Sequence, residues 1–382
     1  MMPAIDLAKK LADPDGKVEV SACLSRWEKE RRVDEAVALL HVLITDQCPV
    51  EVPPPIRVGY GVLIGQALGI RFGLDGVKAL LDIFLHPAFR PLDRHQAELA
   101  CLVAFNHGPD TLERFFKPRP LSTALHDEFL LMLAQEWTLR YGRVDREGIV
   151  EFVHQHATHP LAWLPLLRHD IEKGMRLPTF FAPGNVGYTG DLANSEAGYQ
   201  SAARKFHLSA GIRLAPERYA EEEGSQGSAE FLSAVREWEE KESCVFRLDP
   251  ALFQSVPTAD VALSLPAPAL LSIQEEELAC GLISPERAVQ LLFFGACFGR
   301  PYGGRWFGAY SRLYVWQSLA AMVQIPMSAG VAAVADRVSR CEWFEIRPRG
   351  DFFTHEDLFD LALVGLSPER SRIAGVFATG VD

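Results

Sequence analysis

The sequence predicts a mainly α-helical chain. An N-terminal irregular array of α-helical hairpins, HEAT-like or bundled, precedes an α+β part with a small antiparallel sheet at the C-terminus. Two observations support this prediction. Apolar residues recur at helical spacing through the first 175 residues, and proline and glycine interrupt them at short intervals. After residue 340 the pattern changes to short runs rich in aromatic and branched residues, which are typical of strands.

The N-terminal half predicts short amphipathic helices in succession. Two or three occupy residues 3–47, and the proline-rich run 48–55 ends them because proline cannot continue a helix. Further helices are expected at 56–86 (as a pair), 91–107, 110–116, 122–141, 145–156 and 161–173. Gly142 should end the helix predicted at 122–141, because glycine often follows the last residue of a helix. No fixed sequence period recurs, so a compact bundle remains an alternative to a stacked array.

A change in composition after Met175 predicts a boundary, because the following residues are rich in turn formers and aromatics. We expect three regions: a helical array at 1–175, a loop-rich connector with an acidic helix at 176–245, and an α+β domain at 246–382. The connector helix is predicted at 229–242, on the surface, with its acidic residues solvated. Helices at 288–294, 309–323 and 329–340 should pack on strands predicted at 244–248, 343–347, 359–366 and 372–381.

Composition and charge restrict the possible functions. Of the 382 residues, 48% are hydrophobic and 23% are charged, which is ordinary for a globular protein. The formal net charge of −12 opposes binding to nucleic acid and to anionic membranes. No apolar run approaches the roughly 18 residues of a membrane span. A protein partner is therefore expected, rather than nucleic acid or a membrane.

The cysteines predict a reducing compartment. There are seven, an odd number, and no two have the C-x-x-C spacing. This pattern favours free, mostly buried thiols over a disulfide framework. The first residues also lack the apolar segment of a signal peptide, so a cytoplasmic location is expected.

The segment Gly295–Arg312 holds the densest group of glycine, aromatic and arginine residues in the chain. Consecutive glycines can turn their amides toward a phosphate, and arginines can pair with its charge. The alternative is a purely structural role, a tight corner between two helices in which glycines allow the backbones to approach closely and aromatic side chains fill the core. If the corner binds a phosphorylated or anionic ligand, the residues expected to contact it are Arg300, Tyr302, Gly303, Gly304, Arg305 and Tyr310.

Cys297 stands in the pattern G-x-C-x-G, which resembles the turn that exposes a catalytic nucleophile between a strand and a helix. The context opposes catalysis, because the preceding residues predict a helix and a loop follows. We expect a buried structural cysteine and no catalytic residue.

The histidines at 154, 156 and 159 resemble a metal cluster, but on one helix His154 and His156 point some 200° apart. Solvated histidines at a helix end are the simpler interpretation. No metal and no cofactor are predicted.

The motif Cys297–Gly304, the run Gly308–Ala320 and the closing Val376–Asp382 resemble a bacterial, actinobacterial-type family of unknown function, mainly over residues 285–382. The resemblance implies a soluble bacterial protein and assigns no activity. Because the sequence lacks a complete catalytic constellation, we expect a non-enzymatic protein-interaction or scaffold protein. The alternative is an enzyme or ligand sensor acting at residues 295–312.

Overall fold

The structure is a computed structural model of the chain. It describes residues 4–10, 16–44, 54–85, 95–117, 123–175, 207–208, 219–221, 229–238, 240–249, 251, 256–271, 278–298, 307–348 and 360–379. Of these, the residues up to Ala162 form one compact unit, unit 1, and those from Trp163 form a second, unit 2. Each unit is described by itself.

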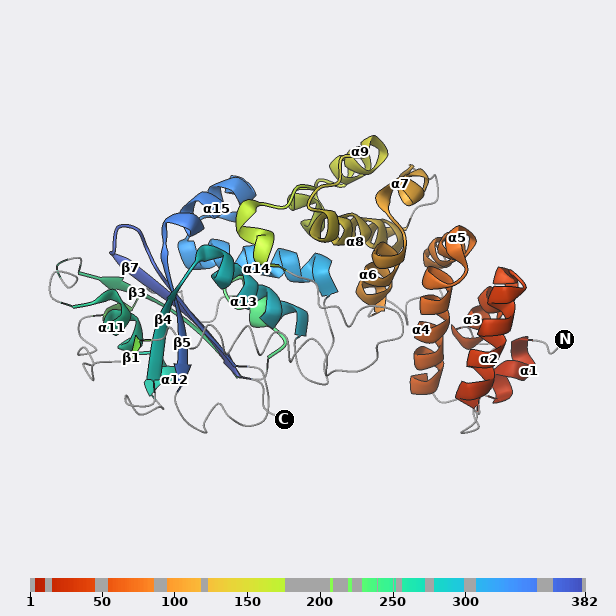
Figure 1. Ribbon diagram of the computed structural model, residues 1–382, viewed down its shortest axis with the longest axis horizontal. Helices are drawn as coiled ribbons and strands as arrows, with labels where there is room; N and C mark the ends of the chain where they lie inside the picture. Colours follow the sequence, from red (N-terminus) through yellow and green to blue (C-terminus); the bar gives the residue numbers. More distant parts are fainter. Residues whose placement is uncertain are drawn as a thin grey trace. The chain divides into compact units, whose positions relative to one another are not determined.

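The described residues of unit 1 form helices and the short turns between them (Figure 1). Its elements are α1 (Ala4–Lys10), α2 (Gly16–Lys29), α3 (Val33–Ile44), α4 (Pro54–Ile70), α5 (Gly73–Phe84), α6 (Gln96–Asn106), α7 (Pro109–Leu112), the 3₁₀ turn η2 (Glu113–Phe116), α8 (Ala124–Tyr141) and α9 (Glu147–Gln155). A further 3₁₀ turn, η3 (Pro160–Trp163), follows at the junction of the units.

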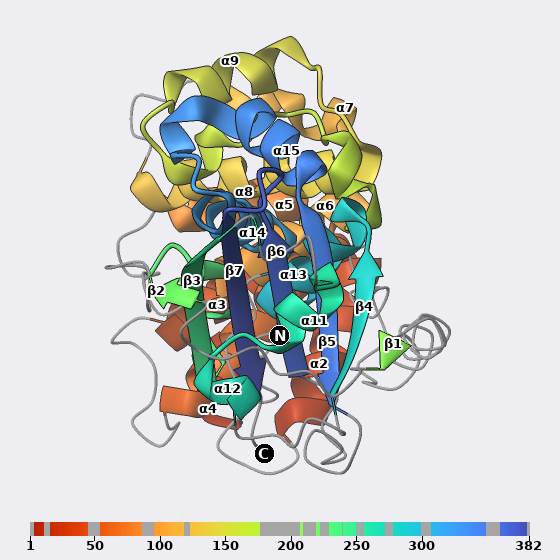
Figure 2. The same cartoon turned by 90° about the vertical axis from the view of Figure 1, so that its left-hand side faces the viewer.

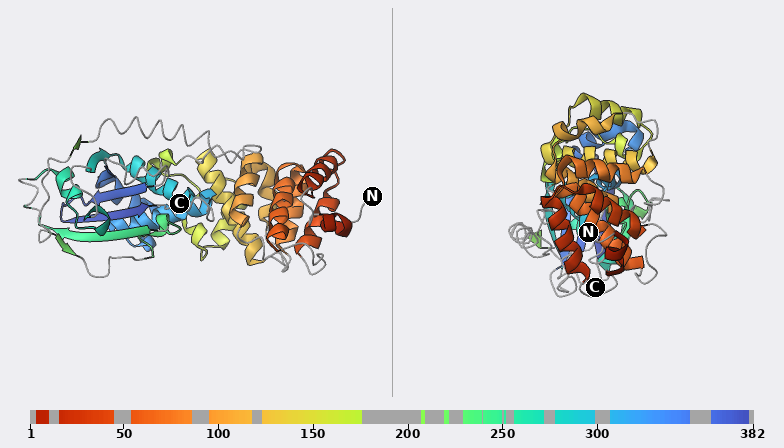
Figure 3. Two further views of the ribbon diagram at one scale, coloured as in Figure 1. Left: turned by 90° about the horizontal axis from the view of Figure 1, so that it is seen from below. Right: turned by 90° about the vertical axis from the view of Figure 1, so that its right-hand side faces the viewer.

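Successive helices of unit 1 pack against one another. Helix α3 contacts α4, α4 contacts both α5 and α6, and α6 contacts α8. Figures 1 and 3 show α2 to α6 side by side in chain order. The apolar stripe predicted on α5, Val77, Leu80, Leu81 and Phe84, is at most 1% exposed. The predicted mainly helical N-terminal region is confirmed.

One helix start and one whole helix of the N-terminal half differ from the prediction. Helix α4 begins at Pro54, inside the proline run, because proline is tolerated in the first turn, where its missing N–H has no helical partner. The helix predicted at 161–173 is wrong. Pro165 lies just beyond its first turn, and a proline there removes a helical hydrogen bond and clashes with the preceding turn. The chain instead forms the short 3₁₀ turns η3 and η4 (Asp170–Gly174).

Unit 2 is built on a seven-stranded antiparallel sheet in the order β1-β4-β5-β6-β7-β3-β2. Neighbouring strands of the sheet pair antiparallel throughout. The strands are β1 (His207–Leu208), β2 (Tyr219–Glu221), β3 (Glu240–Leu248), β4 (Leu278–Ile283), β5 (Glu342–Pro348), β6 (Asp360–Leu366) and β7 (Arg372–Thr379).

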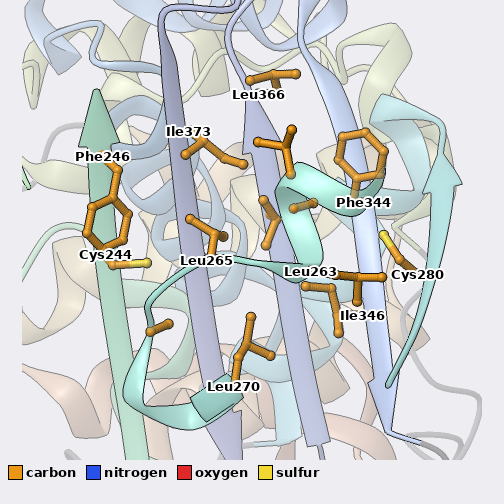
Figure 4. Packing of buried hydrophobic residues seen from close by; sticks show 14 of the residues in the cluster. Cys244, Phe246, Leu263, Leu265, Leu270, Cys280, Phe344, Ile346, Leu366 and Ile373 are labelled. Carbon is orange, nitrogen blue, oxygen red and sulfur yellow. The ribbon is translucent and has the colours of Figure 1, made fainter. Parts of the chain in front are cut away.

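Helices cover both faces of this sheet. Figure 2 shows α11 (Thr258–Leu263) and α12 (Pro268–Leu271) in front of it, and α13 (Pro285–Phe298) and α14 (Phe307–Val323) behind it. Among the described residues, unit 2 also contains the helical elements η4 (Asp170–Gly174), η7 (Ser233–Val235), η10 (Met327–Ala329) and α15 (Gly330–Arg340). On the front face, alternate strand residues such as Phe246, Phe344 and Ile373 pack with Leu263 and Leu265 (Figure 4).

The sheet confirms the predicted C-terminal strands and extends them. Strands β3, β5, β6 and β7 lie close to their predicted places. Strand β4 was missed because its small residues, Ala279, Cys280 and Gly281, hide the alternation that marks a strand. The surface helix predicted at 229–242 is wrong. Phe231 and Trp238 are buried, and the chain from Glu240 joins the sheet as β3.

Glu242 belongs to the run that was expected to be solvated, yet it is partly buried. Its Oε2 accepts a hydrogen bond from the Ala269 N–H at 3.0 Å, which satisfies a donor near the start of α12. Burial raises the pKa of this carboxyl group, against the lowering effect of that hydrogen bond. Glu242 therefore acts as a cap between the sheet and α12.

Within the described ranges, no single helix is both long enough and apolar enough to cross a membrane. The residues Gly308–Val323 and Met327–Arg340 pass such a test only when taken together, and a bend of 105° separates them.

Candidate functional site

Helix α14 lies at the centre of unit 2. It contacts α13, α15, η7 and strand β7, so it is surrounded by protein on most of its circumference. This burial explains why its apolar residues do not gather on one side. Three polar residues of the helix are nevertheless fully buried: Ser311, Arg312 and Ser318. Buried polar groups require hydrogen-bond partners, so the partners of these residues should lie on the segments that pack against α14.

Arg312 pairs with Glu172 of η4, and both side chains are 0% exposed. The Nε of Arg312 donates to Oε1 of Glu172 at 2.6 Å, and one terminal nitrogen donates to Oε2 at 2.9 Å. The Trp316 indole N–H donates to the same Oε1 at 2.8 Å, and the His169 backbone N–H donates to Oε2 at 2.6 Å. Each carboxylate oxygen of Glu172 therefore accepts two hydrogen bonds.

Arg312 also holds the backbone that precedes η4. Its terminal nitrogens donate to the carbonyl oxygens of Pro165, at 2.8 Å, and Leu167, at 3.2 Å. A second anchor is the Trp163 indole, which donates to the Met327 carbonyl at 2.8 Å. All three guanidinium nitrogens thus have acceptors, and the irregular segment 163–175 is tied to the helices by side chains rather than by helical hydrogen bonds.

The electrostatics of Glu172 reflect this enclosure. Burial by itself would raise the pKa of the Glu172 carboxyl group. The charge and hydrogen bonds of Arg312, together with those from Trp316 and His169, outweigh burial and hold the pKa below its usual value. Glu172 is therefore ionised and Arg312 neutralises it. Because each satisfies the other, this pair is a structural clamp rather than an acid–base pair for chemistry.

An aromatic stack lies on another side of α14. The rings of Tyr310 and Tyr314, one helical turn apart, stack with centroids 5.8 Å apart, and the Arg236 guanidinium lies 4.9 Å from the centre of the Tyr314 ring. Tyr310 is partly exposed, whereas Tyr314 is buried. The partly exposed ring of Tyr310 therefore forms the accessible side of the stack, at the first turn of α14.

The structure places the predicted site residues as follows. Cys297 is 2% exposed inside helix α13, so no strand-to-helix turn surrounds it. Tyr310 lies in the stack just described. The other expected ligand contacts, Arg300, Tyr302, Gly303, Gly304 and Arg305, lie outside the described residues. Sequence reasoning missed Arg312 and Glu172. The available signal was a single arginine in the otherwise uncharged run 307–323, because a buried charge requires a partner.

The predicted histidine group also gains partners that the sequence did not suggest. His156 lies 3.2 Å from Asp127, an aspartate of α8, and His126 approaches the other oxygen of the same carboxylate. In the part of the chain that the structure describes, no set of three or more His, Cys, Asp or Glu residues could hold a metal ion.

Comparison with known proteins places the chain in a family. No curated protein and no solved structure matches it. A family model does match, over residues 19–382, so the similarity covers the helical unit as well as the C-terminal part in which the resemblance was noted. Because the match spans most of the chain, this protein belongs to the family of unknown function DUF6183.

Proposed function

We propose that this protein is a non-enzymatic interaction protein whose helical unit 1 binds a partner protein. The observation that carries the proposal is an aromatic patch at the C-terminal ends of α6 and α8. Phe105 is 44% exposed and Tyr141 is 55% exposed, although most large apolar side chains of the unit are buried. The Arg140 guanidinium lies over the Phe105 ring, 5.2 Å from its centre.

The composition of this patch supports a role in binding. Aromatic residues and arginine are enriched at the centres of protein interfaces, where they contribute most of the binding free energy. Arg140 is held in place, because its terminal nitrogen donates to the Cys101 carbonyl at 3.3 Å. Because Arg140 is already held against the exposed Phe105 ring, ordering its side chain costs little conformational entropy when a partner binds.

Site-specific photo-crosslinking tests this proposal. A photoreactive phenylalanine analogue would replace Phe105 or Tyr141 in the full-length protein, and Lys78 of α5, whose side chain is 60% exposed, would serve as the control position. We expect a defined adduct from the two patch positions and not from position 78. The dissociation constant of the purified complex should rise about 30-fold in Phe105→Ala, the effect of a residue that contributes roughly 2 kcal/mol. A complex of unchanged affinity in Phe105→Ala and Tyr141→Ala would refute the proposal.

The second candidate function is binding of an anionic small molecule at residues 295–312. Two observations on α14 favour it. Tyr310 presents the edge of an aromatic stack, and the buried Ser311 hydroxyl has no hydrogen-bond partner among the described residues. Thermal-shift measurements with inorganic phosphate and nucleotides test it. Stabilisation that disappears in both Arg300→Ala and Arg305→Ala would support ligand binding, and no stabilisation of the wild-type protein would count against it.

A further inference from the structure

Arg140, the penultimate residue of α8, has no counter-ion among the described residues. One of its terminal nitrogens lies 3.3 Å from the carbonyl oxygen and 3.2 Å from the sulfur of Cys101, and its guanidinium covers the Phe105 ring. Its Nε is buried and has no hydrogen-bond partner in the described part of the chain, and no carboxylate there forms an ion pair with it. A partly buried cation of this kind gains free energy when an anion from outside the chain pairs with it.

The two arginines that follow α8 differ from Arg140, because each has a carboxylate partner. Arg143 lies 3.6 Å from Asp145, and Arg146 pairs with Asp110. Both of these arginines are exposed, whereas Arg140 is partly buried. Within the described ranges, Arg140 is therefore the member of this group whose charge is not neutralised by a neighbouring side chain.

The aromatic patch beside Arg140 has a fixed position. Helices α6 and α8 pack against each other (Figure 1). The Trp137 indole N–H donates to the His107 carbonyl at 2.8 Å, which ties the last turn of α8 to the residue that follows α6. A Cβ at Gly108 would lie 4.0 Å from the Tyr141 hydroxyl, so the Tyr141 side chain lies beside the junction of α6 and α7. The patch is thus already ordered before a partner binds.

We propose that the aromatic patch recognises a short segment of the partner protein in which a single carboxylate lies beside an apolar side chain. The carboxylate pairs with the Arg140 guanidinium, and the apolar side chain packs on Phe105 and Tyr141. This inference rests on the proposed function, because it names the chemistry of the partner that the patch binds.

Electrostatics favour one carboxylate at this place rather than an acidic run. Hydrogen bonds between a guanidinium and a carboxylate are among the strongest in proteins, and partial burial beside an aromatic ring reduces screening by water. The net charge of −12 opposes the approach of a strongly acidic segment. The C-terminal ends of α6 and α8 also carry partial negative charge, so a carboxylate would be repelled there if Arg140 were absent. The sign of the carboxylate's effect on affinity therefore depends on Arg140.

Peptide selection on the full-length protein tests this inference. Random peptides displayed on phage would be selected for binding to the wild-type protein, and those that still bind the double variant Phe105→Ala/Tyr141→Ala would be discarded. In synthetic versions of the remaining peptides, each side-chain carboxylate would be replaced by its amide, and the terminal carboxylate would be amidated separately. We expect removal of one carboxylate to raise the dissociation constant about 10- to 100-fold, the range for a hydrogen bond to a charged group. The separate replacements distinguish a side-chain carboxylate from a terminal one.

Variants of the protein assign the effect to Arg140. Arg140→Met should bind the acidic peptide and its amide form equally well, or the amide form more tightly. Arg143→Met removes an exposed arginine that already has a partner, and it should retain the wild-type preference for the acidic peptide. The midpoint of thermal unfolding of each variant checks that the protein is folded. The comparison of the two peptides on the wild-type protein needs no variant.

The outcomes separate this inference from the proposed function. Peptides that require Phe105 and Tyr141 but keep their affinity when every carboxylate is removed would overturn the inference and leave the proposed function intact. A preference for the acidic peptide that persists in Arg140→Met would also overturn it. A selection that yields no peptide dependent on the aromatic patch would contradict both.

Discussion

Arg312 and Glu172 form an ion pair across 140 residues of sequence, with both side chains fully buried. The pair joins the central helix of unit 2 to the irregular segment through which the chain enters that unit. Removing two charges from water is costly, and the pair repays this cost only because nearly every donor and acceptor in it is satisfied. The effect of the pair on the free energy of unfolding should therefore be large when one partner is removed and small when both are replaced.

Replacement of Glu172 by Gln should lower the free energy of unfolding of unit 2 by about 3–5 kcal/mol, because Arg312 would then be a buried charge without a counter-ion. Urea unfolding followed by tryptophan fluorescence measures this loss. The double variant Glu172→Leu/Arg312→Met removes both charges and should recover most of the stability. Equal losses in the single and double variants would show that the pair is not coupled.

Trp316→Phe provides a graded version of this test. The change removes one hydrogen bond to the Glu172 carboxylate and keeps most of the aromatic volume. We expect a loss of about 1–3 kcal/mol, the range for a hydrogen bond to a charged group. In the background of the double variant, which lacks the carboxylate, the same change should cost much less.

Acid should destabilise unit 2 through Glu172. The pKa of this carboxyl group is lowered in the folded state, from an ordinary value of 4.5, because Arg312 and its other donors outweigh burial. The stabilisation is therefore complete above about pH 4.5 and is lost as pH falls through the folded-state pKa. Unfolding midpoints of the wild-type protein should fall through this interval more steeply than those of Glu172→Gln.

The exposed pair of Arg337 and Glu369 is a control for that experiment. The hydrogen bond from Arg337 lowers the pKa of Glu369 to about 2, but this carboxylate lies at the surface. Salt screens such a pair, whereas it screens a buried pair much less. In 1 M salt the difference in pH dependence between the wild-type protein and Glu369→Gln should largely vanish, and that between the wild-type protein and Glu172→Gln should persist.

Two cysteines should be poor nucleophiles in the folded protein. Burial, followed by the charge of Asp260, raises the pKa of the Cys280 thiol to about 12. Burial raises the pKa of Cys341 to about 11, although this residue is partly exposed. Since the thiolate is the reactive form, alkylation at pH 8 should leave both unmodified in mass spectra. Both should react in denaturant, and rapid labelling of Cys280 without denaturant would contradict its burial.

Two glycines in the hairpin of α4 and α5 should respond oppositely to alanine. A Cβ at Gly76 would lie 2.2 Å from the Leu68 carbonyl oxygen, and the backbone of α4 cannot move aside cheaply. A Cβ at Gly59 meets nothing within 4 Å. Gly76→Ala should therefore lower the midpoint of thermal unfolding. Gly59→Ala should raise this midpoint, because alanine favours a helix over glycine by up to about 1 kcal/mol of folding free energy.

The local elements of this protein could be predicted to the extent that periodicity marks them. The α5 stripe shows the 3.6-residue period of a helix, and strands β5 to β7 are short apolar runs rich in aromatic and branched residues; these elements form as expected. The run 229–242 also shows helical spacing, yet Phe231 and Trp238 are buried by non-local packing and the chain turns into β3. Burial against distant segments overrode the local preference there, as it commonly does.

The sequence by itself determined the helical first half, the C-terminal strands and the presence of a charged residue in the otherwise uncharged run 307–323. Only the tertiary structure decided which residue pairs with that charge. Periodicity reports which side of an element is apolar, but it carries no information on what packs there. Glu172 meets Arg312, and Asp127 meets His156, because folding brings together segments that have no local signal for each other.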